Sequence, residues 1–299
     1  IERFTKLYPA DLRPQADDII LNWAFYTIVK SHLHGNSIPW KDLMISGWCL
    51  AEDKSKMSKS KGNVITPVEL IKEKGTDAVR YWAATSRLGQ DTAFSPDLLK
   101  IGKKLTGKLW NATQFAAIHL AKLDRPCESA AADMEQGIIT ETLDRWILSR
   151  LGETVARATK AFDAYEYADA LDATNQFFWA DFCDNYLELV KRRAYNEDGG
   201  ASDAAQASAV RTLYYCLETI LKLYAPFVPH VTEELYTAIF APNYTDEFKQ
   251  SIHSRYQWPR AEHYTVEEES LNIGRDALAV LEAIRKTKSD AKKSIKFPV

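Results

Sequence analysis

The sequence predicts a mainly α-helical protein that begins with a short α/β segment. Apolar residues recur at helical spacing over most of the chain beyond Ser95. An earlier apolar run, residues 43–50 with Gly47 inside it, is typical of a strand buried on both faces. Glycine (12) and proline (11) are sparse among the 299 residues, which excludes collagen-like and low-complexity chains.

Composition narrows the class of protein further. With 46% apolar and 26% charged residues, the chain is ordinary globular protein, and its length suggests about two domains. It contains neither a run of roughly 18 apolar residues nor a signal peptide, so we expect a cytoplasmic protein that does not contact a membrane. The four cysteines form no C-x-x-C pair, which excludes the common zinc ribbons and fits a reducing compartment with no disulfide framework. We expect no bound metal in this chain. Because the net charge is -3, any nucleic-acid contact must come from local basic patches.

The first fifty residues predict one helix and one strand. Residues 14–18 are turn-like, and the apolar spacing over 19–29 predicts a helix that ends in the stretch 35–39. A helix, a short loop and a buried strand are typical of the second half of a doubly wound sheet. The chain starts at Ile1 without a methionine and stops at Val299 in a strand-like run, so we expect it to be a fragment.

Short helices follow the polar loop at 51–63. Thr66, Pro67 and Glu69 form a helix-start signature of N-cap, first-turn proline and third-position acid. A second helix is expected from Asp77 to about Ala84, and residues 88–94 are expected to form a loop or a short strand.

The remainder of the chain predicts a helical bundle. Residues 95–97 cap a helix that runs to about Leu120, and residues 171–190, apolar on most sides, predict a central buried helix. Polar connectors are expected at 124–134 and 197–202. Two other stripes have helical spacing: Leu143, Trp146, Ile147, Leu151, Val155 and Phe162, and Val210, Leu213, Tyr214, Leu217, Ile220, Leu221 and Tyr224.

The loop at 51–63 carries the clearest sign of chemistry. Lys56, Lys59 and Lys61 follow the predicted strand directly, which is where open α/β sheets place their ligands. Lysine supplies a mobile positive charge for phosphate groups, and the hydroxyls of Ser58 and Ser60 can add hydrogen bonds. On charge pattern alone, however, a solvated loop is the commoner interpretation.

The pentapeptide KMSKS at 56–60 shifts that balance, since chance would place it in such a chain on the order of once in ten thousand. It resembles the KMSKS signature of class I aminoacyl-tRNA synthetases. The similarity covers nearly the whole chain from about Pro14. The stretches GQDTAF, KLWNATQF, FCDNYLELVK, PFVPHVTEELY and SIHSRYQWP look most like the valine enzymes. The alternatives are an isoleucine or leucine enzyme, or a non-catalytic RNA-binding or scaffold module that kept the loop as a relic.

The resemblance implies an enzyme that uses ATP with Mg²⁺ to convert valine to valyl-adenylate and then transfers the acyl group to valine tRNA. Lys56 and Lys59 would be catalytic and would stabilise the charge of the departing pyrophosphate. In this interpretation Asp18 binds the ATP ribose. Ala16 stands where the family usually has glycine, so Asp18 could instead be the N-cap of the helix at 19–29. The implied ATP-binding set is Lys56, Met57, Ser58, Lys59, Ser60, Asp18, Gly47 and Trp48, the last two beside the adenine.

Two parts of the family pattern have no counterpart in the sequence. These are the other ATP signature, His-x-Gly-His, and the inserted editing domain that hydrolyses mischarged threonine. The nearest string, His32-Leu33-His34-Gly35, has the wrong order and follows a helix. We therefore expect the chain alone to be inactive in charging tRNA.

The resemblance also divides the chain into three parts. Residues 1–63 match the C-terminal part of a Rossmann-like catalytic domain with the KMSKS loop. Residues 64–96 match a stem-contact segment, and residues 97–299 match a helical anticodon-binding domain. We expect the protein to be a monomer.

The implied tRNA-binding residues lie on the helix that follows Ser95. They are Lys103, Lys104, Lys108 and Asn111, and basic clusters at 191–193 and 285–293 could add phosphate contacts. Each group has an alternative: the helix lysines could be a solvated face, and 191–193 could complement a helix dipole. Gln114 stands where the family often has a basic residue.

The remaining conspicuous side chains are interpreted as structural. We expect the large aromatic residues in the helical part to be core, the neighbouring carboxylates to form salt bridges and not a metal site, and the lone histidines to pack or cap. In the same order, these sets are Trp110, Trp146, Trp179 and Phe182; Asp181, Asp184 and Glu188; and His119 and His230.

Overall fold

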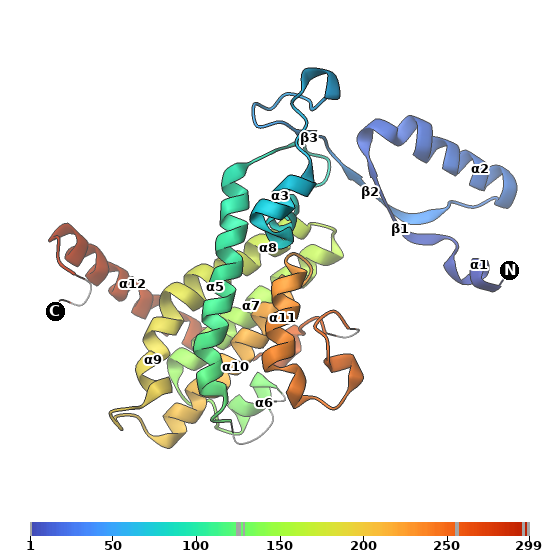
Figure 1. The fold of residues 1–299 in the computed structure, drawn as a ribbon. Coiled ribbons are helices and arrows are strands. Elements are labelled where there is room, and N and C mark those ends of the chain that lie inside the picture. The colour runs from blue at the N-terminus through green and yellow to red at the C-terminus, as the bar shows by residue number, and fades with distance from the viewer. Residues whose placement is uncertain (1, 124–126, 128, 255–256, 295–296, 298–299) are drawn as a thin grey trace. The chain divides into compact units, whose positions relative to one another are not determined.

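The computed structural model describes residues 2–123, 127, 129–254, 257–294 and 297. Helices make up most of the described chain (Figure 1), as the sequence predicts. Two compact units are present, one formed by Ile1–Lys104 with Ala161–Asp169 and the other by Leu105–Lys160 with Ala170–Val299.

The first unit begins with a strand, a helix and a second strand. After α1 (Glu2–Leu7), strand β1 (Ala10–Ala16) pairs in parallel with β2 (Trp40–Ser46). Figure 1 shows α2 (Phe25–Gly35) as part of the connection between them. A 3₁₀ turn (Asp17–Ile19) and a π-helical turn (Ile20–Ala24) lead into α2, and left-handed Asn36 ends it. The α/β arrangement expected at the N-terminal end is therefore confirmed.

Two local expectations in this region are wrong. Residues 14–16 lie in β1 and not in a turn. Pro14 can occupy β1 because, among the described residues, this strand has only β2 as a neighbour, and proline is tolerated at a sheet edge. The apolar run at 43–50 is not one strand buried on both faces. Instead β2 ends at Ser46 and is partly exposed, and β3 (Cys49–Leu50) pairs in parallel with β4 (Thr92–Ala93).

Two short helices lie between β3 and β4. Helix α3 (Pro67–Lys74) begins after Thr66, although the Thr66 side chain makes no capping hydrogen bond, and α4 (Thr76–Ala84) follows Gly75. Both helices were expected. The long helix α5 (Pro96–Leu120) also begins as expected, with the Leu98 N–H donating to Ser95 Oγ at 3.3 Å.

The second unit is a helical bundle (Figure 1). Besides the rest of α5, it contains most of α7 (Thr142–Asp163) and of α8 (Tyr167–Gln176). Its other helices are α6 (Ala130–Glu135), a π-helix (Phe177–Tyr186), α9 (Leu187–Tyr195), α10 (Asp203–Tyr224), α11 (Pro229–Ile239) and α12 (Glu268–Asp290), with 3₁₀ turns at Ala241–Asn243, Glu247–Lys249 and Ala261–His263. Part of the connector expected at 124–134 is therefore helical. Residues 124–126 and 128 of that connector lie outside the described residues.

The most deeply buried helix of the bundle is α10. Every residue from 208 to 221 is buried, whereas the helical stretch at 171–190, expected to be central, leaves Asp172, Ala180 and Glu188 exposed. The stripe seen at 210–224 therefore understates the burial of α10. Small and polar side chains such as Ser208 and Thr212 complete its circumference and do not register as apolar.

The core prediction is right for two aromatic residues and wrong for one. Trp146 and Phe182 are buried, and Trp179 is half-buried. Trp110 is 47% exposed. It lies on α5 next to Leu109, which belongs to the buried face, and one residue further along a helix turns a side chain by about 100°, so that Trp110 points away from that face.

Candidate functional site

The lysine loop is a closed structure. Leu50 and Lys56 form an antiparallel bridge, and the Ala51 N–H donates to the Ser55 carbonyl at 2.9 Å. Lys54 adopts a left-handed conformation at the tip of this small hairpin. Strand β3 therefore leads directly into the KMSKS segment and holds its first residue beside the strand.

Asn63 fastens the other end of the loop. Its Oδ1 accepts a hydrogen bond from the Ser58 N–H at 2.9 Å, and its Nδ2 donates to Ser55 Oγ at 2.9 Å and to the Lys56 carbonyl at 3.3 Å. Sequence reasoning missed this role. The only signal was the loop-favouring Gly-Asn pair after the lysines, which does not reveal the partners.

The two serines of the pentapeptide take part in the loop's own hydrogen bonds. Ser58 Oγ accepts from the Lys61 N–H at 3.2 Å and so caps the 3₁₀ turn Lys59–Lys61. Ser60 Oγ lies 3.2 Å from Ser58 Oγ. Both hydroxyls thus help to shape the turn that carries Lys59.

The lysine side chains differ in their surroundings. The Lys56 ammonium lies over the Trp48 indole, 3.4 Å from the ring centroid. Lys59 is exposed and has no ion-pair partner among the described residues. Asp53 lies nearby, and its pKa is lowered by hydrogen bonds from Ser55 and by the charge of Lys61.

Gly47 and Trp48 lie where two backbone segments cross. A Cβ atom on Gly47 would approach the Gln90 carbonyl oxygen to 2.3 Å, so this position requires glycine. The Trp48 N–H donates to Asp91 Oδ1 at 2.8 Å, and the Trp48 carbonyl accepts from the Thr92 N–H at 2.8 Å. The loop therefore starts from a fixed backbone.

Asp18 and Gly47 follow the carboxyl ends of paired parallel strands. Ala16, the last residue of β1, pairs with Ser46, the last residue of β2, and ligands of open α/β sheets bind at this edge. Asp18 is exposed. The alternative that it caps the following helix is wrong, because the residues at the N-cap positions are Ala16 and Ile19 and neither cap has a side-chain hydrogen bond.

Gln15 is a further polar residue near this edge that sequence reasoning missed. It is 8% exposed, and neither its amide nitrogen nor its amide oxygen has a hydrogen-bond partner among the described residues. A buried, unpaired amide is uncommon in folded proteins. No sequence signal separates it from an ordinary strand glutamine.

The basic residues expected to contact RNA on α5 are displayed to differing degrees. Lys103, Lys104 and Asn111 are exposed and Lys108 is half-buried. Lys108 borders a groove of about 590 Å³ that is also lined by Arg285 and other residues of α12. The groove holds carboxylates as well as basic groups, so its charge is mixed.

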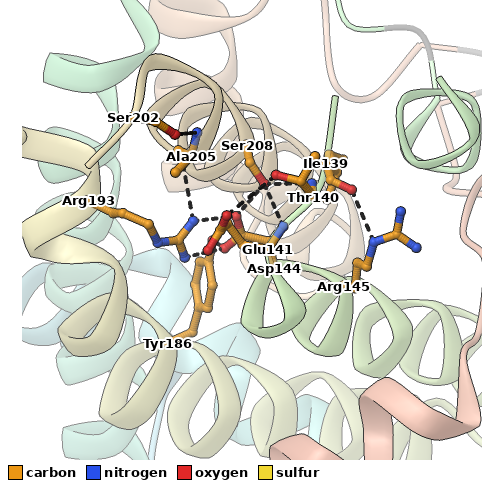
Figure 2. Close-up of polar contacts among 10 residues, drawn as sticks. All are labelled: Ile139, Thr140, Glu141, Asp144, Arg145, Tyr186, Arg193, Ser202, Ala205 and Ser208. Atoms are coloured by element: carbon orange, nitrogen blue, oxygen red, sulfur yellow. Dashed lines mark hydrogen bonds and ion pairs between the residues drawn. The ribbon is translucent and has the colours of Figure 1, made fainter. Parts of the chain in front are cut away.

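Arg193, a member of the basic cluster at 191–193, is paired within the bundle (Figure 2). Arg193 donates to both carboxylate oxygens of fully buried Asp144, at 2.6 and 2.7 Å. The same carboxylate accepts from Tyr186 Oη at 2.8 Å and Ser208 Oγ at 2.6 Å. Burial alone would lower the pKa of Arg193, but the hydrogen bonds and charge of Asp144 raise it above its usual value. Arg193 is therefore a structural residue.

The remaining members of these clusters also pair locally. Lys191 lies 2.5 Å from Glu188, and Arg192 lies 2.9 Å from Asp198. Asp181 accepts from Arg150 at 3.1 Å, so salt bridges are confirmed for two of the three carboxylates interpreted in that way. His119 is confirmed as a packing residue, since it is buried beside the rings of Phe115 and Tyr195.

Neither the requirements of a metal site nor those of a membrane-spanning helix are met by the described residues. Within the described ranges, no three His, Cys, Asp or Glu side chains gather in a group that could hold a metal ion. No described helix combines the length and the apolar character needed to cross a membrane.

Two segments of the chain match known protein families. Residues 1–95 match the family of class I tRNA synthetases for isoleucine, leucine, methionine and valine. Residues 144–298 match the anticodon-binding domain of tRNA ligases.

Curated relatives of this chain include valine–tRNA ligases. The Rickettsia felis protein is 48% identical over 305 residues, covering 100% of this chain and 34% of its own length. The Ehrlichia canis protein is 48% identical over 291 residues, covering 97% of this chain and 34% of its own length. The chain thus spans about a third of the length of these relatives.

Solved structures with a similar fold are also synthetases. The Mycobacterium tuberculosis methionyl-tRNA synthetase in complex with methionyl-adenylate has a TM-score of 0.60 and 27% identity, covering 79% of this chain and 45% of that one. A ternary complex of Agrobacterium radiobacter K84 LeuRS with tRNA and LeuAMS has a TM-score of 0.59 and 20% identity, covering 89% of this chain and 30% of that one. The second likeness concerns the fold alone.

Proposed function

The chain belongs to the tRNA ligases that carry this anticodon-binding domain, and on that premise we propose that it supplies the ATP loop and the tRNA contacts of a valine–tRNA ligase. The complete reaction would join valine to the α-phosphorus of ATP, release pyrophosphate, and pass the valyl group to the terminal ribose of valine tRNA. Mg²⁺ would arrive with the phosphates of ATP.

The observation that carries this proposal is the loop at 51–63. Its hydrogen bonds hold Lys56 and Lys59 on one closed segment beside a strand end. Two ammonium groups on such a loop can reach the charge that develops on the departing phosphates, and preorganised positive charge lowers the barrier of phosphoryl-type transfer. Ser58 and Ser60 shape the turn that carries Lys59, and Met57 would contribute to the nucleotide site from its place between the two lysines.

The nucleotide would lie along the neighbouring strand ends. Asp18 would accept hydrogen bonds from the ribose hydroxyls, and Gly47 and Trp48 would flank the adenine. Their common place at the carboxyl edge of paired parallel strands supports this arrangement. The unpaired amide of Gln15 is a further group that this edge offers to a polar ligand.

The tRNA would be held by the helical part. Lys103, Lys104 and Lys108 would contact backbone phosphates, and Asn111 a base or ribose. Exposure of Trp110 beside them adds an aromatic surface of the kind that stacks on unpaired bases. We assign these contacts to the part at 97–299, the catalytic remnant to 1–63 and the stem contact to 64–96, in a monomeric cytoplasmic protein.

Amino-acid charging by a full-length protein that contains this chain tests the function. We expect it to charge valine tRNA with valine, and the isolated chain to give no valine-dependent pyrophosphate exchange. Preferential charging with isoleucine or leucine would assign the chain to that enzyme instead. Binding of tRNA without charging of any amino acid would favour a non-catalytic RNA-binding module. Robust exchange by the isolated chain would show that the proposed division of labour is wrong.

A further inference from the structure

The position of the Lys56 ammonium is the starting observation. It lies 3.4 Å from the centroid of the Trp48 indole, well within the range of a cation–π contact. Among the described residues no carboxylate forms an ion pair with Lys56. The Lys56 ammonium therefore faces an aromatic ring, whereas Lys59 on the same loop makes no such ring contact with any described residue.

The backbones of both residues are held in place. Trp48 hydrogen bonds through its N–H to Asp91 and through its carbonyl to Thr92. Lys56 bridges to Leu50 and accepts from Asn63 through its carbonyl. The contact with the indole involves only the flexible Lys56 side chain, so a rotation of that side chain is enough to free its ammonium.

We propose that Trp48 is a positioning residue that holds the Lys56 ammonium over its indole ring while no nucleotide is bound and releases it to the triphosphate of ATP. The arrangement without nucleotide is called the reserve state. This inference rests on the proposed function, because it takes ATP to be the ligand of the loop. An exposed cation–π contact is weak, and a charge-assisted hydrogen bond to phosphate is stronger. The exchange is therefore favourable, and the reserve keeps the ammonium within reach of the phosphates.

Competitive lysine acetylation measures the reserve state directly. The nucleotide-free chain is treated with a trace of acetic anhydride, and modification of Lys56, Lys59 and Lys61 is quantified by mass spectrometry. Lys56 should react about two- to fivefold more slowly than the other two, because a contact of this strength keeps the amine occupied for most of the time. W48L should abolish the difference.

Graded variants separate the aromatic contact from a general structural effect. W48F and W48Y retain a ring and should keep part of the protection, even if W48L folds poorly. W23L removes an exposed tryptophan elsewhere and should leave the three rates unchanged. Equal rates for the three lysines in the unmodified chain, or undiminished protection of Lys56 in folded W48L, would overturn the proposal.

The transfer to ATP is tested with a full-length protein that contains the chain. With ATP at a concentration that saturates each protein, Lys56 of the W48L variant should become as protected as Lys56 of the parent protein, because the phosphates then hold it. If Lys59 becomes protected while Lys56 of W48L stays reactive, the transfer does not occur. If ATP protects neither lysine in the parent protein, the loop does not bind ATP, and both the proposed function and the transfer to ATP are wrong. The acetylation rates measured without nucleotide then still decide whether Trp48 holds the Lys56 ammonium.

Discussion

Gly47 illustrates how much a single residue can be constrained by the crossing of two backbones. The sequence places a glycine inside an apolar run, and sequence reasoning attributes it to adenine binding. The structure shows an independent need, because the Gln90 carbonyl occupies the space of a Cβ atom. The neighbour that imposes this need lies some forty residues away along the chain, which local sequence cannot reveal.

Alanine at Gly47 should therefore destabilise the protein. A clash with backbone atoms cannot be relieved by a side-chain rotation, so we expect G47A to lower the free energy of unfolding in urea by about 1–3 kcal/mol. G107A is the matched control. Gly107 lies in α5 with open space around it, so alanine there should raise stability by about 0.5–1 kcal/mol. Equal effects of the two substitutions would contradict the crossing described here.

The candidate site shows the same limit at residue scale. Lys56 and Lys59 are recognisable from the pentapeptide, but Asn63 and Gln15 are not, because their importance depends on which atoms they meet or fail to meet. Short motifs reveal the groups that do chemistry. The residues that hold those groups in place become visible only in the folded chain.

At the scale of elements, the helices of the bundle are joined by a buried ion pair. Asp144 on α7 accepts hydrogen bonds from the π-helix, α9 and α10 (Figure 2). The sequence marks Arg193 only as one member of a basic cluster. Its partner lies 49 positions away, so the choice between RNA contact and structural contact could not be made from spacing.

Removal of Arg193 should strongly destabilise the bundle. R193M leaves the buried Asp144 carboxylate without its counter-ion, and we expect a loss of about 3–5 kcal/mol in the free energy of unfolding. R192M is the control on the adjacent residue. Its exposed salt bridge to Asp198 contributes less than about 1 kcal/mol. Similar losses for the two variants in denaturant titrations would refute the structural assignment of Arg193.

The exposed face of α5 is the surface on which we expect tRNA to bind. If Lys104 and Lys108 contact phosphates, K104Q and K108Q should each weaken binding of valine tRNA and make the slope of log affinity against log salt less steep by about 1. K160Q, which removes an exposed lysine on α7, should change neither. Unchanged affinity and slope in both α5 variants would show that these lysines form a solvated face.

At the scale of the whole molecule, the sequence predicts the class of fold better than its internal divisions. Helical periodicity indicates the bundle, and it does so because each helix buries one apolar face. It fails where a helix is buried on all sides, as in α10, and where an apolar run is split between two sheets, as after Ser46. These outcomes depend on packing partners and not on local pattern.

The proposed reaction belongs to proteins that are longer than this chain. It spans about a third of the length of the valine–tRNA ligases it resembles, and the helical connection between β1 and β2 exposes large apolar side chains such as Leu21 and Leu33. Exposed apolar surface of this kind is typical of a face that packs against other protein. The ATP-binding role proposed for the loop is therefore tested in a full-length protein.

The roles proposed for Lys56 and Lys59 are tested by replacing each lysine with alanine in a full-length protein that contains this chain. The quantity measured is the rate of valine-dependent pyrophosphate exchange. If Lys56 and Lys59 stabilise the departing pyrophosphate as proposed, each replacement removes one of the stabilising charges, so we predict a fall of roughly 100- to 1,000-fold in the exchange rate. K54N, which removes a lysine at the hairpin tip of the same loop and suits its left-handed backbone, should retain the parent rate within about twofold. Exchange at the parent rate in both alanine variants would show that these two lysines do not stabilise the departing pyrophosphate.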